Sequence, residues 1–348
     1  MSIFDLVTSQ ELSAYWLTLT QDREPFLGEE LFPDDKKRGL DLKWIKGAKG
    51  LPCVLKTSAF DAKAIPRPRI GFDKLMTQMP FFKESTYIDE ELRQELNLVL
   101  ETGNQAYIDS VMTKVFDDEI RLIESASVSR ERMRMQAITT GVVAMSANGQ
   151  SFSYDYGLPD NHMGEAKVAW SDATNSDPCE DIRVAKEIIL DDTGTTVTRA
   201  VCNSVTWRKL RNNEKIKKEI YVMTNGAGAV RDSQLSDYLS DLLPDGIAIN
   251  DKRYVDEAGD IQKYIPDGVF VLLPPQTLGK TWFGTTPEES DLMTSGVANV
   301  TIVDTGVAVT TVQSSDPVNV ETKVTQICLP SFEAADEVFI LDVEPSGD

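Results

Sequence analysis

The chain has 348 residues, of which 41% are hydrophobic and 26% are charged, and its formal net charge is −21. One hydrophobic core rarely grows beyond about 250–300 residues, so the length predicts at least two lobes. The composition excludes a chain that is disordered throughout, and the lack of long apolar runs excludes a membrane-spanning helix. The charge argues against general nucleic-acid binding. The N-terminal residues lack the pattern of a secretion signal, so we expect a cytoplasmic protein.

Positive charge is concentrated in residues 36–83, which carry twelve basic and three acidic side chains. The net charge of this basic segment is +9, which leaves −30 for the remainder of the chain. A basic segment on an acidic body suggests docking onto another copy of the same chain. The alternative is a solvated loop whose charge serves no contact, and the charge pattern alone leaves both open.

The same segment favours an extended hairpin. Residues 40–46 alternate partly between apolar and polar side chains, and residues 47–50 suit a hairpin tip. We expect the return limb at residues 53–55, followed by Pro66 and Pro68, which favour an edge strand. So few apolar side chains cannot fold a hairpin alone, so it has to lie on another surface.

Residues 81–158 contain no proline and predict a long helix followed by a hairpin. Apolar residues recur at helical spacing over residues 89–139, with a break expected at Gly103 and a stop at Gly141. Asn148 and Gly149 then form a strong two-residue turn signal between two strands within residues 142–154.

The second half of the chain mixes helices and strands. Helices are predicted at residues 181–190, 204–218 and 232–243, and strands at residues 219–223, 246–249, 252–255 and 268–273. Residues 297–343 are predicted to be almost wholly strand, because they are dense in β-branched side chains. The fold class is therefore mixed α+β.

The strongest enzyme-like signal is the loop that contains Gly226 and Gly228, between a predicted strand and a predicted helix. A dinucleotide-binding fingerprint needs a third glycine, but Arg231 stands at that position. A plain glycine-rich turn is the better interpretation, and a nucleotide-dependent enzyme is the weaker alternative.

Metal and nucleophile signals are sparse. The four cysteines, Cys53, Cys179, Cys202 and Cys328, form no CxxC pair, and His162 is the single histidine. A Cys/His zinc site needs several such ligands at close spacing, so we expect small buried thiols and an exposed loop histidine. Adjacent carboxylates are frequent because the chain has 56 acidic residues. We therefore expect no catalytic residue, no metal and no cofactor.

Several runs resemble the lambda-like major capsid protein family of tailed phages, which has the Hong Kong 97-type capsid fold. Residues 32–38 resemble the start of the family's extended hairpin loop, and residues 126–149 resemble its spine helix and the hairpin that follows. Residues 265–271 and 330–342 are similar to strands of its axial and peripheral lobes. The strand-rich stretch at residues 297–320 is longer than the resemblance leads us to expect.

The resemblance implies five parts: an N-terminal arm, an extended hairpin loop, a spine helix with the peripheral-lobe hairpin, an axial lobe and the closing strands of the peripheral lobe. On this sequence they fall at residues 1–34, 35–86, 87–170, 171–313 and 314–348. It also implies that the extended loop lies over a neighbouring subunit. The basic side chains expected at that contact are Lys36, Lys37, Arg38, Lys43, Lys46, Lys49, Arg67 and Arg69.

The implied function is that of a non-enzymatic major capsid protein that self-assembles into the icosahedral head of a tailed double-stranded DNA phage. Implied partners are further copies in hexamers and pentamers, a separate scaffolding protein, a portal and an optional decoration protein. The shell would enclose DNA without specific binding, bind no membrane, assemble in the host cytoplasm and reside in the virion. The alternative within the same fold is an encapsulin-like compartment shell.

Overall fold

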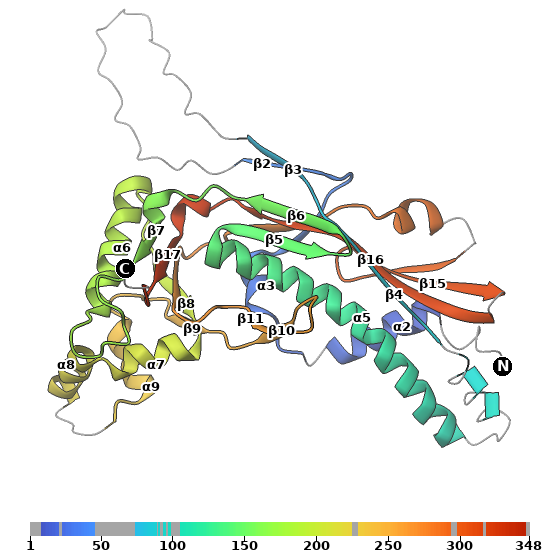
Figure 1. Cartoon of the computed structure of the whole chain (residues 1–348), viewed down its shortest axis with the longest axis horizontal. Coiled ribbons are helices and arrows are strands. Elements are labelled where there is room, and N and C mark those ends of the chain that lie inside the picture. The colour runs from blue at the N-terminus through green and yellow to red at the C-terminus, as the bar shows by residue number, and fades with distance from the viewer. Residues whose placement is uncertain are drawn as a thin grey trace, which may run out of the picture. The chain divides into compact units, whose positions relative to one another are not determined.

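A computed structural model describes residues 8–20, 23–45, 74–88, 90, 93–94, 97–98, 105–224, 229–293, 298–315 and 318–345. These residues adopt a mixed α+β fold and cluster into two compact units (Figure 1). The first unit draws on the segments Met1–Leu42, Met76–Met133 and Lys280–Ser331. The second unit draws on Lys43–Leu75, Arg134–Gly279 and Phe332–Asp348. Two units agree with the expectation that one core would not serve 348 residues.

The elements follow one another along the described ranges as in Figure 1. The α-helices are α2 (Ser9–Thr20), α3 (Leu27–Leu31), α5 (Gln105–Thr140), α6 (Pro178–Thr193), α7 (Ser204–Asn212), α8 (Glu214–Thr224) and α9 (Asp232–Leu239). Short turns of other helix types are η1 (Asp160–His162), η2 (Glu288–Leu292) and η3 (Ala335–Glu337). The strands are β1 (Asp34–Lys36), β2 (Asp41–Ile45), β3 (Lys74–Gln78), β4 (Phe81–Tyr87), β5 (Val142–Ala147), β6 (Gln150–Asp155), β7 (Met163–Glu165), β8 (Arg199–Cys202), β9 (Ile247–Ile249), β10 (Arg253–Val255), β11 (Ile261–Lys263), β12 (Val269–Leu273), β13 (Gly279–Phe283), β14 (Asn299–Val303), β15 (Val307–Ser315), β16 (Val318–Phe332) and β17 (Phe339–Asp342).

A mixed sheet with strand order β1-β13-β16-β15-β14 organises the first unit, and β4 also pairs with β16. Strand β16 is antiparallel to both β15 and β4, with Val324 opposite Val309 on one side and Glu84 on the other. Helix α5 lies against this sheet, where Gln326 on β16 donates to the Ala126 carbonyl at 3.0 Å. The strand-rich tail predicted from the sequence is therefore confirmed, with β14, β15 and β16 in this sheet and β17 in the sheet of the second unit.

Helix α5 ends where the sequence predicts. Gly141 has φ +71°, a left-handed conformation that glycine adopts at low cost, and a Cβ there would lie 2.9 Å from Leu158 Cδ1. The following hairpin, β5–β6, turns at Asn148 (φ 53°) and Gly149 (φ 72°), which matches a type I′ turn. Gly103 lies outside the described residues.

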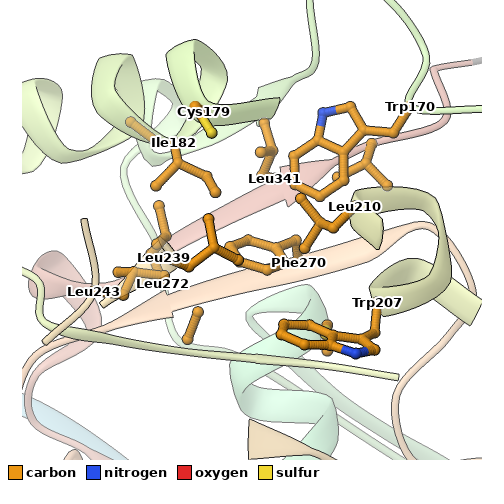
Figure 2. Close-up of a cluster of buried hydrophobic side chains, with 14 of the residues drawn as sticks. Trp170, Cys179, Ile182, Trp207, Leu210, Leu239, Leu243, Phe270, Leu272 and Leu341 are labelled. Atoms are coloured by element: carbon orange, nitrogen blue, oxygen red, sulfur yellow. The ribbon is translucent and has the colours of Figure 1, made fainter. Parts of the chain in front are cut away.

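The second unit is built on a five-stranded sheet with order β7-β17-β12-β8-β9. Its core contains the side chains of α6, α7, α8 and α9 packed against strands β12 and β17. Figure 2 shows Ile182 of α6 and Trp207 and Leu210 of α7 gathered around Phe270, Leu272 and Leu341. The rings of Trp170 and Phe270 lie 5.3 Å apart at their centroids. Long aliphatic and aromatic side chains therefore fill the space between helices and sheet.

The strand predicted at residues 219–223 is wrong, because this stretch belongs to helix α8. The buried Asn213 accepts backbone N–H bonds from Lys215 at 3.0 Å and Ile216 at 3.1 Å, which caps the start of the helix. Ile216 and Ile220, four residues apart, are both buried. Capping and burial at helical spacing override the strand preference of the local side chains.

The exposed position predicted for His162 is also wrong. Its polar neighbours form the turn η1, which places the imidazole in the interior of the second unit at 0% exposure. The Nε2 atom lies 3.1 Å from Asp192 Oδ2, and the ring lies 6.4 Å from that of Phe339. His162 is thus a core residue.

The strand predicted within residues 40–46 is confirmed as β2, and its described partner is a strand that the sequence analysis did not name. Strand β2 pairs with β3. Residues 46–73 connect these two strands along the chain. The predicted tip and return limb lie outside the described residues.

Cys179, Cys202 and Cys328 are buried free thiols, as predicted, while Cys53 lies outside the described residues. Burial raises the pKa of the Cys202 thiol to about 12, so this thiol stays protonated at neutral pH. Among the helices of the described residues, none is both long and apolar enough to cross a membrane.

The core of the second unit generates a stability prediction. Phe270→Ala removes a fully buried ring, so the free energy of unfolding should fall by about 3–5 kcal/mol. The control Val184→Ala, at a half-exposed position on α6, should change it by less than about 0.5 kcal/mol. Urea denaturation followed by tryptophan fluorescence measures both, and equal losses would contradict this core assignment.

Candidate subunit-contact surface

The basic segment leaves the first unit through a short parallel strand. Strand β1 pairs with β13, with Asp35 opposite Trp282 and Lys36 opposite Phe283. The Lys37 N–H donates to the Phe283 carbonyl at 2.8 Å and extends this pairing by one residue. The start of the segment is therefore fixed to the sheet of its own subunit.

Two ion pairs hold the same start. Asp35 Oδ2 lies 2.6 Å from Lys280 Nζ, and Lys36 Nζ lies 2.6 Å from Glu289 Oε1. The hydrogen bond from Lys280, with a further one from the Lys36 N–H, lowers the pKa of the Asp35 carboxyl. Exposed pairs of this kind contribute only about 0–1 kcal/mol each to the free energy of unfolding. Their main effect is therefore to fix the path of the chain at the start of the basic segment.

The acidic turn η2, which pairs with Lys36, is fixed to the sheet by contacts of its own. Glu288 is buried, accepts a hydrogen bond from Thr325 Oγ1 at 3.0 Å and lies 3.8 Å from Lys323 Nζ. Its neighbour Glu289 forms the Lys36 pair. Part of the predicted contact charge is therefore used inside the subunit.

The end of the basic segment returns to the same sheet. Strand β4 pairs with β16 over seven positions, from Phe81 opposite Ile327 to Tyr87 opposite Glu321. Lys83 on this strand is exposed. Both ends of the segment are thus anchored in one unit, which leaves residues 46–73 as the connection between β2 and β3.

The structure describes half of the basic side chains that the sequence assigns to a contact. Lys36, Arg38 and Lys43 are exposed and Lys37 is half-buried. The other four, Lys46, Lys49, Arg67 and Arg69, lie outside the described residues. Among the described four, Lys36 is paired with Glu289 of its own chain, whereas Arg38 and Lys43 present their charge to solvent.

Trp44 anchors β2 within the second unit, a role that the sequence analysis missed. Leu42 and Trp44 are buried whereas Asp41 and Lys43 are exposed, which is the period-two pattern of a half-buried strand. The Trp44 ring lies 5.5 Å from that of Tyr154 and 6.1 Å from that of Tyr156. The available signal was a lone tryptophan at an alternating position in an otherwise basic segment.

The N-terminal helix α2 is fixed to the first unit through Asp304, at the β14–β15 turn. One carboxylate oxygen of Asp304 accepts from Trp16 Nε1 at 3.2 Å, and the other lies 2.8 Å from Arg130 Nη2. Arg130 is buried and also donates to Gln326 Oε1 at 3.0 Å. Asp304 has φ +49°, a left-handed conformation that aspartate tolerates better than most residues.

Beside this network lies an open polar pocket of about 310 Å³. Its lining includes Arg23 and Glu29, which are paired at 3.0 Å, together with Arg130 and Asp304. The lining carries two arginines and three carboxylates, of which Arg23 pairs with Glu29 and Arg130 with Asp304. The pocket lies where α2, α5 and the sheet of the first unit meet, and its paired charges suit a structural role.

The described residues give little support for metal binding or dinucleotide binding. Within the described ranges, no cluster of His, Cys, Asp or Glu could hold a metal ion. Gly226 and Gly228 lie outside the described residues, but helix α8 precedes their loop, so the strand that a dinucleotide fingerprint requires is replaced by a helix.

Comparisons with known proteins gave one family match and several matches to solved structures. A family model described as Phage major capsid protein E matches residues 8–343. The fold is similar to a protein described as a capsid protein of an Escherichia coli CFT073 prophage, with 14% identity, a TM-score of 0.59 and coverage of 97% of this chain and 99% of that chain. A phage-related protein from Bordetella bronchiseptica RB50 matches with 13% identity, a TM-score of 0.56 and 97% coverage of both chains.

The cyanophage A-1(L) capsid protein matches with 11% identity, a TM-score of 0.50 and 92% coverage of both chains. At such low identities the structural matches establish the fold alone. No curated protein has a significant sequence match.

The Asp304 network predicts how α2 is held. Asp304→Gly keeps the turn, because glycine adopts positive φ, but removes both acceptors and leaves Arg130 without its carboxylate. The free energy of unfolding should fall by about 2–3 kcal/mol. The control Asp304→Asn keeps one acceptor and should lose less than about 1.5 kcal/mol in urea denaturation. A loss below about 0.5 kcal/mol in Asp304→Gly would show that the carboxylate does not hold the network.

Proposed function

Because the chain belongs to the phage major capsid protein E family and is a structural, non-enzymatic subunit of a multimeric virion shell, we propose that its basic segment ties each copy to a neighbour in that shell. The observation that carries the proposal is the anchoring of both ends of the segment in the sheet of its own subunit. An anchored segment with net charge +9 can reach outward without detaching, and each copy presents −30 elsewhere to receive it.

The proposed contact residues are the eight basic side chains predicted from the sequence. Arg38 and Lys43 are the best supported, because both are exposed at the base of the segment. Lys36 is the least supported, since Glu289 of the same chain already lies 2.6 Å away. Lys37, Lys46, Lys49, Arg67 and Arg69 complete the set.

The assembly around this contact is proposed as follows. Hexamers and pentamers of the chain form the icosahedral head of a tailed phage in the host cytoplasm, with a separate scaffolding protein, a portal and an optional decoration protein. The net charge of −21 suits a shell that encloses DNA without binding it tightly, because like charges repel. No specific observation favours the encapsulin-like alternative over the phage family.

The proposed division into parts also changes where the two compact units cut across it. The expected axial lobe covered residues 171–313, yet strands β14 and β15 pair in the sheet of β16 in the first unit. This pairing supports assigning residues 280–313 to the peripheral lobe and residues 171–279 to the axial lobe. By the same criterion, residues 134–170 and 332–348 belong with the axial lobe, because β7 and β17 pair in the sheet of the second unit. The arm at residues 1–34, the extended loop at residues 35–86, the spine helix within 87–170 and the start of the closing segment 314–348 stay as proposed.

A charge-reversal experiment tests the basic contact. The double variant Arg38→Glu/Lys43→Glu lowers the charge of the segment from +9 to +5 and places acids against an acidic neighbour. Shell yield, measured by sedimentation of the full chain, should fall severalfold at low salt, and the deficit should shrink as salt screens the charges. The melting temperature of the unassembled subunit should change by less than about 3 °C.

The matched control is Lys167→Glu/Arg183→Glu, which makes the same change in charge at two exposed positions of the second unit. It should assemble nearly as well as the wild type. Equal loss of shells in both double variants would mean that total charge, not the basic segment, limits assembly, and the proposed contact would be discarded.

A further inference from the structure

The β10–β11 hairpin presents apolar side chains to solvent. Val255 and Ile261 lie directly opposite each other across the hairpin and are 63% and 69% exposed. β-branched residues in such a pair normally pack against something, and cross-strand pairs of this kind are units of sheet stabilisation. Their exposure in an isolated subunit marks the hairpin as a surface with a missing partner.

The turn that joins the two strands is acidic and rigid. Residues 256–260 contain Asp256, Glu257 and Asp260 and no basic residue. Asp256 Oδ1 accepts from the Ala258 N–H at 3.0 Å and the Asp260 N–H at 2.9 Å, and Oδ2 accepts from Gln262 Nε2 at 3.0 Å. The acidic turn and the apolar pair are therefore held in one fixed arrangement.

Helices α7 and α8 carry net positive charge, opposite in sign to the acidic turn. Helices α7 and α8, residues 204–224, contain six basic and two acidic side chains, a net charge of +4 in an otherwise acidic chain. Lys215, Lys218 and Val222 recur at helical spacing along the outer face of α8, and Val222 is 80% exposed. The Asn213 cap and the buried Ile216 and Ile220 fix this helix to its unit.

The two surfaces lie apart within the second unit, as Figure 1 shows for α8 and the β10–β11 hairpin. A hairpin therefore does not reach the α8 of its own chain, but it can reach that of another copy. Two different, complementary patches on separate parts of one subunit generate a head-to-tail contact, and such contacts close into rings when the rotation allows.

We propose that the β10–β11 hairpin of each subunit docks on helix α8 of the next subunit around a ring. Val255 and Ile261 cover Val222, while the acidic turn faces Lys218, because Lys215 Nζ already lies 3.1 Å from Asp177 Oδ2 of its own chain. The proposal rests on the assembly of this chain into a shell and names a second interface, distinct from the basic segment.

Another copy of the chain fits these patches better than a different partner does. The hairpin offers acidic side chains and α8 offers basic ones, and both expose apolar side chains that can cover each other. Among the described residues of the second unit, Val222, Ile261 and Val255 are the three most exposed large aliphatic side chains. The other acidic groups near α8 belong to the same chain: Asp177 lies 3.1 Å from Lys215 Nζ, and Tyr238 of α9 donates to Glu219 of α8. These groups are engaged within the subunit.

Cross-linking tests the contact directly. In the full chain, Lys218→Cys combined with Asp260→Cys, treated with a short bis-maleimide during assembly, should give a denaturing-gel ladder that ends at a closed hexamer or pentamer. Each single-cysteine variant is a control and should give at most dimers, because a single new thiol can link only two copies. Assembled shells of the double variant that show no ladder beyond the controls would overturn the proposal.

A charge exchange gives a second test that does not depend on new thiols. Lys218→Glu alone and Asp260→Lys alone should each lower shell yield at least about threefold, since each places like charges together at every copy. The combined variant restores the pairing in reverse and should regain most of the yield. Both positions are exposed, so the melting temperature of the subunit should stay unchanged.

The outcomes separate this docking from the function on which it rests. Normal assembly of both single variants, with loss of assembly in Arg38→Glu/Lys43→Glu, would reject the hairpin contact and keep the shell function. A wild-type chain that forms no particle under any condition would count against both.

Discussion

Copies of a chain with net charge −21 repel one another, and this repulsion is the constraint on any shell that they build. Along the sequence, positive charge is not spread evenly over this acidic chain. It is concentrated in the basic segment at residues 36–83 and on the face of helices α7 and α8. Such separation allows unlike patches to meet in one relative orientation while most other orientations bring acids together.

Folding of the subunit is largely independent of these surface charges. Each compact unit has its own interior, with the sheet of β16 in the first and the cluster around Phe270 in the second. The buried Arg130 of the first unit is paired within the same chain, with Gln326 and Asp304. Exposed lysines and arginines are therefore free to serve contacts between copies, at little cost to the stability of one copy.

Much of the fold follows from local signals in the sequence. The Asn148–Gly149 turn, the stop at Gly141 and the strand-rich tail all depend on residues next to one another, and all are confirmed. The errors arise where a longer stretch of sequence or tertiary packing decides the structure. Residues 219–223 look like a strand until the Asn213 cap and the buried Ile216 are known.

The candidate contact surface also has features that the sequence could predict and features that it could not. The charge of the basic segment can be counted from the sequence, so its basic residues were predictable as a set. The pairing of Lys36 with Glu289 could not be predicted, because 253 positions separate them along the chain. The packing of Trp44 against Tyr154 was hidden for the same reason, since it depends on tertiary structure.

The most direct measurement of the central claim is a cryo-electron microscopy map of assembled particles at side-chain resolution. The account predicts that Arg38, Lys43 and the basic side chains of residues 46–73 lie within about 4 Å of Asp or Glu oxygens of a neighbouring copy. A map in which these side chains contact only acids of their own chain, or only solvent, would contradict it.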